Sequence, residues 1–93
     1  MSSAQRPLTS AQIRAARALV RWRAEDLARA SAVGVATIRR AELTEAQTSM
    51  TTANNLAVRR ALEGAGVEFI EEDGSGGPGV RLRKRQRPRP PKE

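Results

Sequence analysis

The sequence predicts a mainly α-helical fold of four short helices, followed by a small C-terminal β hairpin and a basic tail. Apolar residues recur at helical spacing over residues 8–66, and the pattern then changes to β-type residues around a glycine-rich turn. The last residues are rich in arginine, lysine and proline, which is typical of disordered chain. We therefore divide the chain into a disordered N-terminus (1–7), a helical domain (8–66), a hairpin (67–83) and a disordered basic tail (84–93).

The composition limits both the core and the chemistry of the protein. With 93 residues, one Trp, one Phe and no Tyr, the chain predicts a single small domain with an aliphatic core. A domain of this size gains stability when dimerisation buries more of its surface. The absence of Cys and His argues against disulfides, thiolate or imidazole catalysis and the usual zinc sites, so we expect no enzyme activity, metal or other cofactor.

The charge is unevenly distributed along the chain. Residues 1–80 hold ten arginines against nine acidic residues, whereas residues 81–93 hold seven basic residues against one acidic residue. Most of the net charge of +7 therefore belongs to the tail. No apolar run is long enough to span a membrane, and the first ten residues lack the apolar core of a signal peptide, so we expect a soluble, cytoplasmic protein.

The first helix has the clearest start signal. Thr9 is placed to cap it, Gln12 to complete a capping box, and Leu8 to pack against Ile13. We expect this helix to run to about Trp22. The second helix is expected over 24–31, the third over 35–43 with a possible continuation to 46, and the fourth from about 51 to 66, where Gly66 takes a left-handed conformation.

The segment after the fourth helix predicts two strands, 67–70 and 80–83, joined by the glycine-rich turn 72–79. An isolated hairpin is marginally stable in water, so it must pack on the helices or pair with a second chain. The residues that we expect at a dimer contact are Leu56, Phe69, Ile70, Val80 and Leu82.

Residues 24–42 predict two short helices joined by a tight turn, with the second helix lying across the first. Apolar residues such as Leu27, Val33 and Ile38 are spaced to face the core. The opposite face of the second helix then presents Val35, Ala36, Arg39 and Arg40. A short exposed helix with arginines on its free face suits insertion into the major groove of DNA.

This segment resembles the helix-turn-helix of the phage Cro and repressor regulators, also called the xenobiotic-response-element family. The resemblance extends over residues 8 to about 67 and implies a lambda-repressor-like, four-helix DNA-binding domain. The residues in matching places are Asp26-Leu27-Ala28, Val33, Ala36-Thr37-Ile38 and Glu42. In the family, an arginine of the first helix commonly pairs with the glutamate that closes the third helix. The resemblance therefore implies a buried ion pair between Arg17 and Glu42.

Three positions depart from the family pattern. Ala24 replaces a glutamine that often contacts DNA, so we expect one contact fewer. Ala32 replaces the turn glycine, which is unfavourable if the backbone there is left-handed. Gly34 replaces a capping serine and leaves the first amides of the third helix without a side-chain acceptor, so that they can meet a DNA phosphate instead.

The resemblance also implies which residues contact DNA. Val35, Ala36 and Arg40 match base-reading positions, with Arg40 as the main reader, and Arg39 reads a base or holds a phosphate. The alternative is that both arginines form an ordinary solvated helix face. The residues that we expect at phosphates are Arg23, Thr37, Thr44, Thr48 and Ser49.

The function that the sequence favours is sequence-specific regulation of transcription. We expect a homodimeric repressor that binds double-stranded DNA at a palindromic operator, associated with the nucleoid. One alternative is an antitoxin that represses its own operon and binds a toxin; a contact with RNA polymerase is also compatible with the sequence. Another is a nonspecific architectural protein, because the basic tail is either a solubilising segment or a clamp on DNA phosphates.

Overall fold

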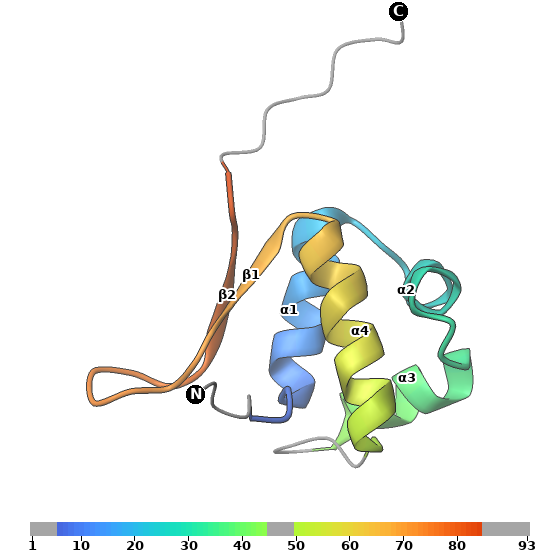
Figure 1. Cartoon of the computed structure of the whole chain (residues 1–93), viewed down its shortest axis with the longest axis horizontal. Coiled ribbons are helices and arrows are strands. Elements are labelled where there is room, and N and C mark those ends of the chain that lie inside the picture. The colour runs from blue at the N-terminus through green and yellow to red at the C-terminus, as the bar shows by residue number, and fades with distance from the viewer. Residues whose placement is uncertain (1–5, 45–49, 85–93) are drawn as a thin grey trace, which may run out of the picture.

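The computed structural model describes residues 6–44 and 50–84. Helix α2 packs against α3 and α4, α1 packs against α3 and both strands, and α4 packs against β1. In Figure 1 the hairpin lies on one side of α1 and α4, and α2 and α3 lie on the other side. The elements are α1 (Ser10–Val20), α2 (Ala24–Ser31), α3 (Val35–Leu43), α4 (Thr52–Gly64), β1 (Val67–Ile70) and β2 (Gly79–Leu82). The mainly helical fold with a small C-terminal hairpin is therefore confirmed.

The start of α1 has the predicted capping box, but the helix ends earlier than expected. The Thr9 hydroxyl accepts a hydrogen bond from the Gln12 N–H at 3.0 Å, and the Gln12 side-chain oxygen accepts one from the Thr9 N–H at 3.0 Å. The helix ends at Val20 rather than about Trp22, because Arg21 adopts a left-handed conformation with φ of 60°. A residue whose backbone is left-handed cannot continue a right-handed helix.

The end of α3 settles the alternative between a short and a long third helix. The helix ends at Leu43, and Thr44 is extended with φ −76° and ψ 164°, so a continuous helix to Ala46 is wrong. Hydrogen bonds stabilise this stop, because the Ser10 hydroxyl donates to the Thr44 carbonyl at 2.5 Å and the Thr44 hydroxyl donates to the Ala41 carbonyl at 3.0 Å.

Helix α4 begins where predicted and ends two residues early. Thr51 caps it by accepting a hydrogen bond from the Asn54 N–H at 3.1 Å. Gly64 is its last residue, and Gly66 takes the predicted left-handed region with φ of 113°. A positive φ at this point suits glycine, and it turns the chain from α4 directly into β1.

The hairpin packs on the helices, which is one of the two arrangements expected for it. The strands are antiparallel with Val67 opposite Leu82 and Ile70 opposite Gly79, so β2 begins and ends one residue earlier than predicted. The Gln12 amide of α1 donates to the carbonyls of Gly79 at 3.0 Å and Ile70 at 3.3 Å. The same side chain that closes the capping box therefore also fastens the hairpin.

None of the helices in 6–44 and 50–84 combines the length and apolarity needed to cross a bilayer.

The core of the described residues is aliphatic, as the composition predicts. Eleven apolar residues are buried: Leu8, Ile13, Ala16, Ala24, Leu27, Val33, Ile38, Ala41, Val58, Leu62 and Val67.

Arg59 of α4 is buried as well, which the helical pattern did not predict. Its side chain is 6% exposed, and its guanidinium lies over the Phe69 ring at 5.0 Å from the centroid. The guanidinium also pairs with Glu63 at 3.2 Å and lies 3.9 Å from Glu71. Stacking and ion pairing offset part of the cost of burying this charge, whose Nε atom has no hydrogen-bond partner, and they hold β1 against α4.

The turn between α2 and α3 is made by an alanine in a glycine-type conformation. Ala32 ends α2 with φ of 60° and ψ of 25°, in the left-handed region. Gly34, which precedes α3, is extended with φ −60° and ψ 143° and needs no glycine for its backbone. The strain of this turn therefore falls on Ala32, where the Cβ crowds the backbone.

We expect the substitution Ala32→Gly to raise the free energy of unfolding by up to about 1 kcal/mol, because it removes this Cβ strain. Urea denaturation of the purified protein measures the change. The matched control is Ala30→Gly in α2, which should lower stability by about 1 kcal/mol because glycine is unfavourable inside a helix. Equal effects of the two substitutions would contradict the strain at Ala32.

Candidate nucleic-acid interface

Helix α3 has one face fixed on the core and one face in solvent. Ile38, Ala41 and Glu42 are its buried residues. Of the four residues predicted to face outward, Ala36, Arg39 and Arg40 are exposed. The fourth, Val35, is half-buried and packs against the hydrophobic core. We call these three exposed residues, Ala36, Arg39 and Arg40, the free face of α3.

An ion pair between α1 and the C-terminal turn of α3 fixes the orientation of that face. The Arg17 guanidinium donates to both carboxylate oxygens of Glu42, at 2.7 and 2.8 Å, and to the Trp22 carbonyl at 2.9 Å. The Glu42 side chain is 9% exposed. The hydrogen bond to Glu42 raises the pKa of Arg17 above its ordinary value, against the opposing effect of burial. The Glu42 backbone carbonyl accepts a further hydrogen bond from Arg14.

The two arginines of the free face differ in their surroundings. Arg39 donates from Nη2 to the Oε2 atom of Glu25, which lies in the first turn of α2. This pair is on the surface, with Arg39 56% and Glu25 46% exposed. Arg40, the next residue, is also exposed. The contact between Glu25 and Arg39 was not predicted, because an acidic residue in a first turn is expected simply for the helix dipole.

The residues predicted at phosphates are spread around α2 and α3. Arg23 precedes α2 and is exposed, with its Nε 3.8 Å from the Asp26 carboxylate. Thr37 is half-buried on α3, and the Thr44 hydroxyl is engaged at the end of that helix. Thr48 and Ser49 lie outside the described residues. Arg23 therefore lies at the start of α2, and Thr44 lies at the C-terminal end of α3.

The start of α3 lacks a side-chain cap, as the glycine at position 34 predicts. Gly34 is the N-cap residue and makes no side-chain hydrogen bond to the first turn. The backbone N–H groups of a first turn have no partner within the helix, so they remain donors for water or an anion. These donors lie at the same end of α3 as Ala36.

The predicted dimer-contact residues separate into two groups. Phe69 and Val80 pack against the protein's own core. Leu56 and Ile70 are each 37% exposed, and Leu82 is half-buried on β2. Outward apolar surface therefore remains on α4 and on the hairpin, but the aromatic residue is already used inside the fold.

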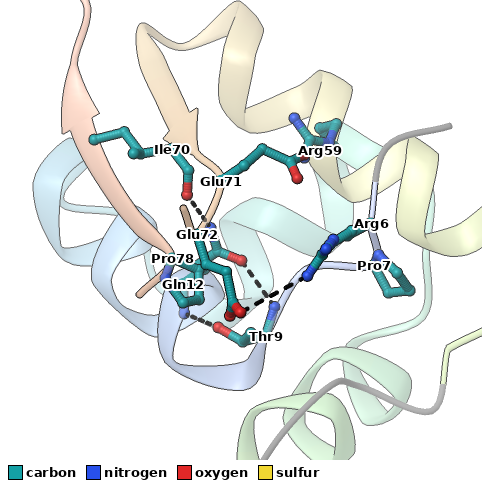
Figure 2. Close-up of a pocket in the computed structure, with 9 residues that line it drawn as sticks. All are labelled: Arg6, Pro7, Thr9, Gln12, Arg59, Ile70, Glu71, Glu72 and Pro78. Atoms are coloured by element: carbon teal, nitrogen blue, oxygen red, sulfur yellow. Dashed lines mark hydrogen bonds and ion pairs between the residues drawn. The ribbon is translucent and has the colours of Figure 1, made fainter. Parts of the chain in front are cut away.

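A small pocket lies beside the hairpin, and none of its lining residues belongs to α3 (Figure 2). Two arginines and two glutamates line it, and Arg6 lies 3.9 Å from Glu72 across it. Its charges therefore balance within the protein. Over the described residues, no group of three or more acidic side chains is arranged to hold a metal ion. The lining residues are Arg6, Pro7, Thr9, Gln12, Arg59, Ile70, Glu71, Glu72 and Pro78.

No protein-family model matches the sequence, and no curated protein matches it significantly. The candidate interface is therefore defined by the residues of α2 and α3 and by their geometry alone.

We expect Glu42→Ala to lower the free energy of unfolding by about 3 kcal/mol, because it leaves the Arg17 charge without its partner at a largely buried site. Urea denaturation measures the loss. The control is Glu68→Ala, which breaks an exposed pair with Arg81 at 3.0 Å and should change stability little, because solvent screens a pair on the surface. An unchanged transition for Glu42→Ala would contradict a structural role for the pair.

Proposed function

We propose that the chain is a sequence-specific DNA-binding regulator of the helix-turn-helix type, which inserts α3 into the major groove. The observation that carries this proposal is the two-sided character of α3. One side is locked by Ile38, Ala41 and the Arg17–Glu42 pair, and the free face carries two adjacent exposed arginines. A short helix presented in this way fits the width of the groove and reaches the base edges.

The side chains of the free face have complementary chemistry toward DNA bases. Arginine donates two parallel hydrogen bonds to the O6 and N7 atoms of guanine, and the methyl group of Ala36 suits contact with a thymine methyl. Arg23 and the uncapped amides of α3 supply donors for phosphates on the flanking backbone. Val35 packs against the core and is half-buried, so only the exposed part of its side chain can contact a base.

The charge distribution separates this proposal from a nonspecific architectural role. Residues 1–80 are nearly neutral, with ten arginines against nine acidic residues. Phosphate attraction alone would therefore draw mainly on the basic residues after position 80. An architectural protein would bind mixed-sequence and selected DNA with similar affinity, whereas a reader based on α3 would distinguish them by a large factor.

We propose further that the regulator acts as a homodimer joined along β2 and that it represses transcription by occupying a palindromic operator. Within the described residues β2 pairs on one edge only, with β1. The Arg83 N–H donates to the Gly66 carbonyl at 2.7 Å, so these two residues form a hydrogen-bonded pair. Hydrogen-bonded and non-hydrogen-bonded pairs alternate along antiparallel strands, so the N–H and carbonyl of Leu82, opposite Val67, point away from β1. An open strand edge of this kind pairs readily with a second chain.

We expect Arg40→Ala to weaken binding to the preferred site by about 1–3 kcal/mol and to relax base preference at one position. Selection from a randomised duplex library, followed by fluorescence anisotropy on the selected duplex, measures both effects. The control is Arg6→Ala, which removes an exposed arginine that lies beside Glu72 and should leave the selected sequence unchanged. If the wild-type protein selects no sequence, or if Arg40→Ala weakens selected and mixed DNA equally, base reading by Arg40 is excluded.

We expect Leu82→Pro to shift the protein from dimer to monomer, because proline removes an N–H that points away from β1. Sedimentation velocity measures the association, and circular dichroism checks that the helices remain. The matched control is Leu82→Ala, which also shortens the side chain but keeps the N–H and should remain largely dimeric. A wild-type protein that stays monomeric at high concentration would contradict this dimer.

A further inference from the structure

A surface ion pair connects the two helices of the proposed reading unit. Glu25 belongs to the first turn of α2, and Arg39 belongs to the free face of α3. The Arg39 Nη2 atom donates to Glu25 Oε2 across the gap between the helices. Because both side chains are about half exposed, the pair lies at the surface that would face DNA.

The negative charge of Glu25 suits the first turn of α2, but at a surface that faces DNA the same charge has a cost. Its own backbone N–H lowers the pKa of its carboxyl below the ordinary value, and the charges of Arg39 and Arg23 lower it further. The side chain is therefore an anion at neutral pH. An anion at a DNA-facing surface repels phosphates and weakens binding to any duplex.

The geometry of the pair leaves Arg39 able to bind a second group. A guanidinium has two edges with paired N–H donors, and a contact through Nη2 alone occupies at most one of them. The other edge remains available for guanine. An arginine that is already held loses less conformational freedom on binding than one that samples many rotamers.

We propose that Glu25 is a positioning residue that directs Arg39 toward a guanine and withholds it from the phosphate backbone. This inference rests on the proposed DNA-binding function. In this arrangement the carboxylate lowers affinity for DNA in general and raises the preference for one base pair. Glu25 of α2 then contributes to the base preference of α3 without contacting a base itself.

The test compares wild-type protein with Glu25→Ala, both as full chains, in two measurements. Selection from a randomised duplex library should show that the guanine preference at one position falls about tenfold in the variant. On a mixed-sequence duplex the variant should bind about twofold or more tightly. Its log–log salt slope should steepen by up to about 0.9, because the released Arg39 gains a phosphate contact.

Two controls separate positioning from simple charge removal. Glu72→Ala removes an exposed carboxylate that faces Arg6 on the hairpin side, and it should leave base preference unchanged. In an Arg39→Gln background, Glu25→Ala should cause no further loss of base preference, because the two residues act as a unit. Thermal melting checks that each variant is folded.

The remaining outcomes overturn the inference in distinguishable ways. If wild-type protein selects a sequence and Glu25→Ala selects the same one with equal strength, Glu25 does not position Arg39, although the proposed function stands. If the variant binds selected and mixed DNA more tightly by the same factor, Glu25 is a repulsive charge alone. If wild-type protein selects no sequence, the proposed function itself fails.

Discussion

The pair between Arg17 and Glu42 determines what α3 presents to solvent. A nine-residue helix has few buried contacts of its own, and Ile38 and Ala41 are the only apolar residues of α3 that are fully buried. The carboxylate at its C-terminal turn accepts two hydrogen bonds from a guanidinium that also binds the Trp22 carbonyl. This bidentate geometry restrains rotation of α3 about its axis, which apolar contacts alone do poorly because they are not directional.

Several arginines of the described part of the chain pair with acidic residues. Arg39 pairs with Glu25, Arg81 with Glu68, and Arg59 with Glu63. Such pairs keep the helical part close to neutral, so long-range attraction to polyanions is weak there. Recognition by a surface of this kind depends on the positions of individual donors, and the basic residues beyond position 80 are left to supply any general attraction.

Local signals in the sequence predicted the helices and the turns well. Thr9 and Gln12 marked the start of α1, and the pattern around Leu27 and Ile38 gave the bounds of α2 and α3. The end of α1 was less predictable, because Arg21 takes a left-handed conformation without being a glycine. The extended Thr44 after α3 accepts a hydrogen bond from the distant Ser10, which no local pattern indicates.

The sequence patterns did not predict contacts between segments that are distant in the chain. Periodicity treats Arg59 as a solvent-facing residue, yet the Phe69 ring and two glutamates accommodate it inside. The crossing of α2 and α3 was expected, but the contact between Glu25 and Arg39 depends on the exact geometry of that crossing, which the sequence pattern does not specify. The candidate surface was thus predictable as a set of α3 side chains, while the α2 residue that holds one of them required the three-dimensional arrangement.

Gln12 illustrates how one side chain narrows the choice of residue at its position. Either glutamate or glutamine completes a capping box, since only an oxygen acceptor is needed. Here the amide nitrogen of the same residue donates to two strand carbonyls, of Gly79 and Ile70. A carboxylate would keep the helix start but would set a negative charge against both carbonyl oxygens. Relatives that retain this hairpin attachment should therefore carry the amide, and a glutamate at this place would mark a chain whose C-terminal strands are held differently.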